Sequence, residues 1–193
     1  MTVPAIETAR LRLVSPDARC LEHLLKGEDV AAAESLDMTL PRRLGESAEG
    51  LLRIRLADLR TAPIAQRWLL RVISEREPPR PMVGFAGFHG PPDRAGRVEV
   101  GYEVLVDYRR RGYALEATRG LLEWARDHGA RKFSAAIALR NVASIGVAEG
   151  LGFRRLGSRW DALHGTELLL ELDADRLDPA GARMGHRPGD DHG

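Results

Sequence analysis

The sequence contains very little cysteine and very little lysine. Cys20 is the only cysteine among 193 residues, so the chain cannot form an internal disulfide bond. It stands in a helical pattern with only His23 nearby, which favours a structural role over that of a nucleophile. Lysine occurs only at Lys26 and Lys132, and arginine supplies the remaining basic charge. We interpret this bias as a feature of coding, with no chemical meaning.

Long apolar runs and an excess charge of one sign are also missing. No segment approaches the roughly 18 apolar residues that a membrane-spanning helix requires, and residues 1–10 lack the basic and apolar regions of a signal peptide. The 29 basic and 28 acidic residues leave a formal charge of +1, which gives no support to a nucleic-acid partner. No group of His, Cys and Asp has the spacing of metal ligands. We therefore expect a cytoplasmic protein without a metal, membrane or nucleic-acid partner.

The rest of the sequence alternates between helix and strand patterns over a length that suits one domain. Strands are predicted over 8–14, 66–73, 82–89, 97–106, 132–138, 152–156 and 166–172, and helices over 17–26, 29–36, 46–60, 112–128 and 142–151. This order describes a mixed α/β (α+β) domain over residues 1–172. From 173 the sequence is rich in Asp, Gly, Pro and His, so we expect a poorly ordered tail over 173–193.

An arginine-rich turn stands between the strand 97–106 and the helix that follows it. It reads Arg109-Arg110-Arg111-Gly112-Tyr113-Ala114. A helix N-terminus has unpaired N–H groups and partial positive charge, so it attracts anions. Gly112 lets the backbone approach a ligand because it has no Cβ, and the arginines add charge. These features describe a pyrophosphate cradle, although a charged surface loop that caps a helix explains the spacing about equally well.

The sequence around this turn resembles the GNAT-type N-acetyltransferases. Arg109-x-x-Gly112-x-Ala114 matches their Arg/Gln-x-x-Gly-x-Gly/Ala signature. The Gly-Lys-Ser/Thr ending of a P-loop and the Gly-x-Gly-x-x-Gly pattern of a dinucleotide-binding turn are both absent from this loop. Three wider blocks are similar to the branch that acetylates the N-termini of ribosomal proteins: 7–13, 99–117, and Asn141-x-x-Ser144 followed by Gly152-Phe153. The resemblance covers residues 6–172. Arg110 stands where this branch often has glycine.

The resemblance implies a single GNAT-like domain. Its mixed, mostly antiparallel central sheet would have six to seven strands, flanked by helices and splayed at the acyl-CoA site. The pyrophosphate of acetyl-CoA would be held by the backbone N–H groups and charges of the loop, at Arg109, Arg110, Arg111, Gly112, Tyr113 and Ala114. The pantetheine arm would pair, as an added strand does, with Val104, Leu105 and Val106. A backbone amide near Leu105 would polarise the thioester carbonyl.

Asn141 and Ser144 extend the implied donor site. The Asn141 amide can donate to and accept from the pantetheine amide. Asparagine is also a good N-cap, here for the helix 142–151, and both roles can hold. Ser144 would lie near the CoA sulfur, or else it is a solvated serine of the first helical turn.

Direct transfer also needs a base that removes the proton of the ammonium group. Strand alternation places Glu99, Gly101, Glu103 and Leu105 on one face of their strand. Either glutamate can be the base, directly or through water, and the resemblance favours Glu99. The alternative is a row of side chains that faces solvent.

The acid that protonates the leaving thiolate is less well defined by the sequence. Many relatives have a tyrosine at the position of Ala148, and this chain does not. Ser144, Tyr113 or water are the alternatives, or the thiolate leaves unprotonated.

The expected function is the transfer of an acetyl group from acetyl-CoA to a primary amine in a ternary complex. The amine is either a protein N-terminus or a small molecule, such as an antibiotic, a polyamine or an amino-acid derivative. The segments 17–60 and 156–166 match least and would build the acceptor pocket, with Trp160 as a candidate lining residue. The alternative is a non-catalytic acyl-CoA-binding or sensing module of the same fold. A homodimer formed through the C-terminal strands is a further expectation that rests on the resemblance alone.

Overall fold

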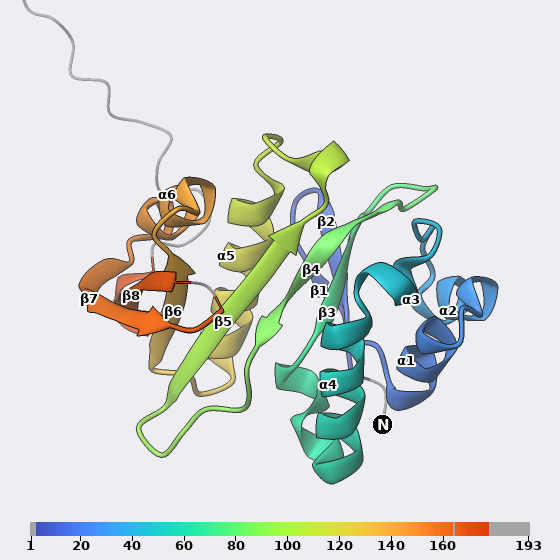
Figure 1. The fold of residues 1–193 in the computed structure, drawn as a ribbon, viewed down its shortest axis with the longest axis horizontal. Helices are drawn as coiled ribbons and strands as arrows, with labels where there is room; N and C mark the ends of the chain where they lie inside the picture. The colour runs from blue at the N-terminus through green and yellow to red at the C-terminus, as the bar shows by residue number, and fades with distance from the viewer. Residues whose placement is uncertain (1–2, 164, 178–193) are drawn as a thin grey trace, which may run out of the picture.

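A sheet of eight strands runs through the computed structural model (Figure 1), which describes residues 3–163 and 165–177. The strands are β1 (Ile6–Glu7), β2 (Leu11–Val14), β3 (Arg71–Glu75), β4 (Met82–Phe88), β5 (Arg97–Val104), β6 (Lys132–Ala138), β7 (Arg154–Asp161) and β8 (Gly165–Asp173). The α-helices are α1 (Ala18–Leu25), α2 (Asp29–Leu36), α3 (Leu44–Ser47), α4 (Glu49–Thr61), α5 (Tyr113–Asp127) and α6 (Val142–Leu151). Short 3-10 helices are η1 (Pro63–Trp68), η2 (Val106–Tyr108) and η3 (Ala174–Arg176).

The strands follow the order β1-β2-β3-β4-β5-β6-β8-β7. Neighbouring strands are antiparallel except for β5 and β6, which are parallel because α5 carries the chain back between them. The predicted mixed, mostly antiparallel sheet is confirmed, with slightly more strands than the six to seven expected.

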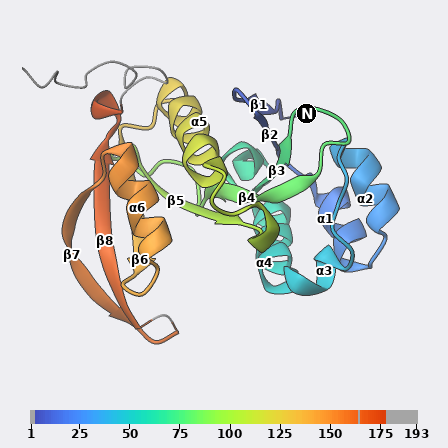
Figure 2. The same cartoon turned by 90° about the horizontal axis from the view of Figure 1, so that it is seen from above.

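Helices cover both faces of the sheet, as Figure 2 shows. On one face, α5 and α6 bury their apolar sides against β4, β5, β6 and β8 in a core that includes Leu121, Leu122, Phe133 and Leu170. On the other face, α1 to α4 pack on β3 and β4 around Leu24, Leu52 and other leucines. Each fully buried leucine contributes about 2 kcal/mol of transfer free energy. Among the described residues, no helix combines the length and the apolar character needed to cross a membrane.

Two strand boundaries near the middle of the chain differ from expectation. Residues Pro63–Trp68 form a 3-10 helix, so the strand expected from 66 begins only at Arg71. The apolar pattern there serves tertiary packing, since the Trp68 ring lies 5.8 Å from that of Phe88 and 5.0 Å from that of Trp124. The strand expected over 97–106 ends at Val104, and η2 follows it.

The C-terminal part of the fold reaches further than expected. The strand β7 runs over Arg154–Asp161 instead of 152–156, and β8 continues through Asp173. The next residues form η3, and Ala174 and Leu177 are buried in the core of α5 and α6. The folded part therefore includes residues that the sequence analysis assigned to the tail. The remainder of that expected tail, 178–193, lies outside the described residues.

Cys20 lies in the first turn of α1, where its backbone N–H donates to the Asp17 carboxylate at 2.8 Å. Only 1% of the residue is exposed, and this burial raises the pKa of the thiol to about 11. Because the thiolate is the reactive form, we expect the native protein to react with a disulfide reagent such as DTNB at neutral pH far more slowly than free cysteine. Unfolding in guanidinium should release one reactive thiol per chain. Rapid labelling of the folded protein would contradict the structural role.

Candidate active site

The strands β5 and β6 lie side by side over only three residues and then separate. Residues Arg97–Glu99 pair with Lys132–Ser134. Beyond that point β5 stays on β4 up to Val104, and β6 stays on β8 up to Ala138. The two strands therefore diverge, which is visible between the green β5 and the brown β6 in Figure 1. The splay that the sequence analysis expected is present.

A cleft of about 360 Å³ lies at this divergence, and we call it the splay cleft. It is lined by β5, β6, the start of α6, and the β7–β8 pair. Three of the predicted site residues, Glu99, Asn141 and Ser144, line it together although they are up to 45 positions apart in the sequence.

The backbone of β5 presents alternate residues to its two neighbours. The Leu105 N–H donates to the Val83 carbonyl of β4 at 2.9 Å, so this amide already has a partner and points away from the cleft. Alternation then places the backbone groups of Tyr102 and Val104 on the side of the divergence. The Val104 carbonyl accepts from Arg109 Nε at 3.0 Å. The amides of Tyr102 and Val104, and not that of Leu105, therefore face the space where a ligand would pair.

The arginine-rich loop makes a sharp turn into α5. Arg110 (φ 61°) and Gly112 (φ 79°) both adopt the left-handed conformation. The helix begins at Tyr113, and its N-cap, Gly112, makes no side-chain cap bond. The first-turn N–H groups of α5 have no acceptor within the helix. The loop thus has the open backbone donors that an anion site requires.

The conformation of Arg110 explains the departure from glycine at this position. A left-handed residue with a Cβ costs about 1–2 kcal/mol. Glycine avoids this cost, which accounts for its frequent use by the branch that the sequence resembles. The same left-handed turn is formed here with arginine, and the residue next to it, Arg111, accepts a hydrogen bond from Arg10.

The support consists of Thr8, Arg10 and Glu116, which we call the loop clamp. The Glu116 carboxylate, in the first turn of α5, accepts from Thr8 Oγ1, Arg10 N and Arg10 Nε, each at 2.7 Å. Arg10 Nη1 donates to the Arg111 carbonyl at 3.0 Å, and its guanidinium lies 4.8 Å from the ring centre of Tyr113. The N-terminal block of the sequence is therefore tied directly to the loop. These residues lie in two of the blocks that resemble the ribosomal-protein branch, although no role was predicted for them from the sequence.

Tyr113 is anchored away from the splay cleft. Only 8% of the residue is exposed, and its hydroxyl donates to Glu75 Oε1 on β3 at 2.6 Å. This hydrogen bond, followed by burial, raises the pKa of Tyr113. The side chain therefore supports the loop, and it is not among the residues that line the splay cleft.

Asn141 caps α6, as one of its two predicted roles requires. Its Oδ1 accepts from the Ser144 N–H at 3.1 Å. The Nδ2 group is left as the donor that can point into the cleft. The cap bond thus fixes the Oδ1 atom of Asn141, whose residue lines the splay cleft.

Glu99 lies at the base of the splay cleft. Its side chain is 35% exposed and lies 3.4 Å from His89 Nδ1. Across the cleft, Arg159 Nε contacts Glu167 Oε2 at 3.0 Å. This hydrogen bond, ahead of the charges of Glu167 and Glu99, raises the pKa of Arg159. The base candidate is therefore set among groups that can carry positive charge.

Glu103 lines a different hollow, of about 190 Å³, on the face of β5 that is turned towards α4. We call it the apolar hollow because Leu51, Leu70, Phe85 and Phe88 contribute to its walls. His89, Gly101 and Tyr102 line both this hollow and the splay cleft. Gly101 forms the floor between the two glutamates, and a Cβ there would lie 3.3 Å from His89 Nε2. The missing side chain leaves the two spaces in contact.

Tyr102 is the site residue that the sequence analysis did not identify. Its hydroxyl donates to the Ser144 carbonyl at 3.0 Å, so the side chain bridges β5 and the start of α6. Burial raises the pKa of Tyr102. Ala148, where many relatives have a tyrosine, is 3% exposed and belongs to the core. Trp160, by contrast, is 74% exposed and lines neither hollow.

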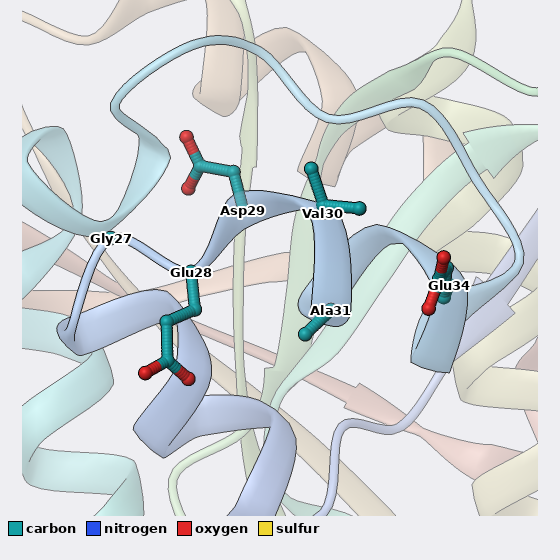
Figure 3. A pocket seen from close by; sticks show the side chains of 6 residues that line it. All are labelled: Gly27, Glu28, Asp29, Val30, Ala31 and Glu34. Atoms are coloured by element: carbon teal, nitrogen blue, oxygen red, sulfur yellow. The ribbon is translucent and has the colours of Figure 1, made fainter.

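Figure 3 shows a third hollow, of about 420 Å³, at the corner between α1 and α2. Its carboxylates belong to Glu28, Asp29 and Glu34, and they point in different directions. Within residues 3–163 and 165–177, no group of three or more His, Cys, Asp or Glu side chains is placed to hold a metal ion. This hollow has none of the convergent geometry of the splay cleft.

Comparisons with known proteins agree with this geometry. Residues 10–154 match the family described as "Acetyltransferase (GNAT) domain". Over 73 residues, 37% of this chain, the sequence is 36% identical to an uncharacterised N-acetyltransferase, YjdG, of Bacillus subtilis (strain 168), and the match spans 44% of that relative.

Two solved structures share the fold. Mycobacterium smegmatis RimJ, in complex with CoA-disulfide, has a TM-score of 0.66 and 19% identity, and the match covers 92% of each chain. The ribosomal-protein-S5-alanine acetyltransferase of Vibrio fischeri has a TM-score of 0.64 and 16% identity, and the match covers 91% of this chain and 100% of that chain.

The loop clamp predicts a pH-dependent contribution to stability. Burial of Glu116 acts to raise its pKa, but the hydrogen bonds from Thr8 and Arg10 outweigh it, so the pKa is lowered. A carboxyl with a depressed folded-state pKa stabilises the fold above its unfolded value, about 4.3, and this contribution is lost as pH falls through the folded-state value. Glu116→Gln should therefore lower the free energy of unfolding by about 1–2 kcal/mol at pH 7.

The difference from wild type should shrink below about pH 4, as measured by urea unfolding across pH. Glu34→Gln, at an exposed position on α2, is the matched control and should change little. An equal loss at pH 3 and pH 7 would contradict a role for the Glu116 charge.

Proposed function

Because the chain belongs to the GNAT acetyltransferase family, we propose that it transfers an acetyl group from acetyl-CoA to a primary amine by direct attack in a ternary complex. The observation that carries this proposal is the splay cleft. An open helix N-terminus lies beyond one end of the diverging strand β5, and the Glu99 carboxylate lies near the point where the strands part. Acetyl-CoA fits this arrangement, because its anionic pyrophosphate would lie at the helix N-terminus and its thioester near Glu99.

The donor would be held mainly through the backbone. The N–H groups of 111–114 would receive the pyrophosphate, with Arg109 and Arg110 adding positive charge. The amides of Tyr102 and Val104 would pair with the pantetheine arm, and the Asn141 Nδ2 group would donate to one of its carbonyls. Leu105 and Val106 would border this path through their side chains. Acetyl-CoA would act as a co-substrate, and the residues that hold it provide no redox or Lewis-acid group.

The acceptor amine would enter from the apolar hollow. Leu51 and Arg55 of α4 line this hollow, so the helical segment expected to build the acceptor pocket contributes to it. Glu99 and Glu103 attract an ammonium group, and the apolar walls accept a compact apolar substituent. A protein N-terminus is our first candidate, since the Vibrio fischeri neighbour is named for a ribosomal protein. A small-molecule amine is the second.

Glu99 would be the general base. It takes a proton from the ammonium group, directly or through water, and the neutral nitrogen attacks the thioester carbon. The C–N bond forms, the C–S bond then breaks, and the electron pair of that bond leaves with sulfur. Fixing both substrates in the cleft removes much of the entropic barrier to this encounter. Glu103 would attract the ammonium group without taking its proton.

The proposal is tested by the release of CoA from acetyl-CoA with a panel of N-terminal peptides and small amines. Glu99→Gln should lower kcat on the order of 10²-fold and flatten the acid limb of the pH profile, because a general base contributes about this much. Glu103→Gln, the matched carboxylate on the same face, should mainly raise KM for the amine. A larger kcat loss in Glu103→Gln would reverse the two roles.

A thermal shift with acetyl-CoA but no CoA release with any amine would favour the non-catalytic module. No shift with any acyl-CoA would contradict the donor site itself.

Gly101→Ala tests the path between the two hollows. The new methyl group would meet only the flexible, half-exposed His89 side chain, so the free energy of unfolding should change by less than about 1 kcal/mol. The methyl group narrows the opening between the splay cleft and the apolar hollow. The value of kcat/KM for a bulky amine should therefore fall about 10-fold more than the value for a compact amine. Gly157→Ala is the control, since a Cβ there meets nothing within 4 Å. Equal losses for both amines would contradict this path.

A further inference from the structure

The position that carries a tyrosine in many relatives has no acid in this chain. Ala148 is buried in the core of α5 and α6 and has no group that can donate a proton. A phenol is nevertheless present in the splay cleft, because Tyr102 reaches it from β5. The hydroxyl enters from the strand and not from α6.

The Tyr102 hydroxyl is held against the first turn of α6. It donates to the Ser144 carbonyl in the first turn of α6 at 3.0 Å. Tyr102 and Ser144 line the splay cleft, and Tyr102 also lines the apolar hollow. Strand alternation directs the Tyr102 side chain to the face opposite Glu99 and Glu103. Its contact with the core of α5 and α6 agrees with this direction.

We propose that Tyr102 is the general acid that protonates the departing thiolate of CoA. This inference rests on the function proposed above. As the C–S bond breaks, the electron pair goes to sulfur, and the phenolic proton passes from Tyr102 to that sulfur. The resulting phenolate recovers a proton from water or, through water, from the Glu99 carboxyl that took the proton of the amine. The nitrogen loses its second proton to water as the amide forms, so the products are the amide, CoA-SH and one proton, and no further reactant is needed.

The surroundings of Tyr102 keep the phenol protonated until sulfur leaves. Burial raises its pKa, and the interaction with the Ser144 side chain, which lowers the pKa, opposes this only in part. The titratable and charged groups around the two spaces are His89, Glu99, Glu103, Arg159, Asp161, Glu167 and Arg55. Four of these are carboxylates, which disfavour a phenolate beside them. A neutral phenol is the form that an acid catalyst must have at the start of the step.

The test compares Tyr102→Phe with wild type in steady-state CoA release. We expect kcat to fall on the order of 10²-fold while KM for acetyl-CoA changes less than about 3-fold. Tyr108→Phe, which removes a hydroxyl just beyond the end of β5, is the matched control and should keep wild-type kcat. Site-specific replacement of Tyr102 by a fluorinated tyrosine, whose phenol is more acidic, should move the alkaline limb of the kcat profile to lower pH.

Each alternative gives a different result. If Tyr102 only anchors α6, Tyr102→Phe lowers Tm but leaves kcat and the alkaline limb unchanged, which overturns the proposal. If it only blocks the cleft, the variant binds acetyl-CoA more tightly at unchanged kcat, which also overturns it. Absence of CoA release by the wild type itself is the separate failure of the proposed function, since the inference concerns a step within that reaction.

Discussion

The structure depends on a parallel strand pairing that stops after three residues. β5 and β6 are each hydrogen-bonded along their outer edges, to β4 and to β8, so neither strand is free to follow the other. Once they part beyond Glu99 and Ser134, their inner edges have no strand partner. Buried backbone groups without partners are costly, and one of them, the Val104 carbonyl, is satisfied by Arg109. The others form an edge that an extended ligand can complete, as an added strand would.

The same divergence determines what the following loop can do. The chain leaves β5 at the open end of the cleft and passes through η2 and the arginine-rich loop into α5, which carries it back to β6. This places the N-terminus of α5 beyond the end of β5, and the loop clamp of Thr8, Arg10 and Glu116 fixes its orientation. Next to the clamped Arg111 carbonyl, Arg110 stands in a left-handed conformation that favours glycine. An anion site of this kind is made by backbone geometry, so it tolerates variation in side chains.

Much of this arrangement could be predicted from the sequence, because its signals are local. The helix after Gly112, the strand–helix–strand unit around it and the cap at Asn141 each follow from residues within a few positions of one another. The predictions that failed depended on distant partners. The apolar run at 66–73 begins as a 3-10 helix because Trp68 packs on Phe88 and Trp124. The Leu105 amide faces β4 because of the register of that pair, which no spacing within β5 reveals.

Tyr102 escaped prediction for a related reason, since its importance depends on α6 coming within hydrogen-bond distance across the divergence. The candidate catalytic side chains of β5 also lie on different faces of this strand. The two-residue period turns Glu103 towards the apolar hollow and Tyr102 towards α6, whereas Glu99 lies at the base of the splay cleft. In the proposed reaction the amine adds to the thioester carbon, and the tetrahedral intermediate then expels the thiolate. The proposed base and acid, Glu99 and Tyr102, both line the splay cleft but extend from opposite faces of β5. In the proposed reaction, one can therefore serve the amine and the other the sulfur.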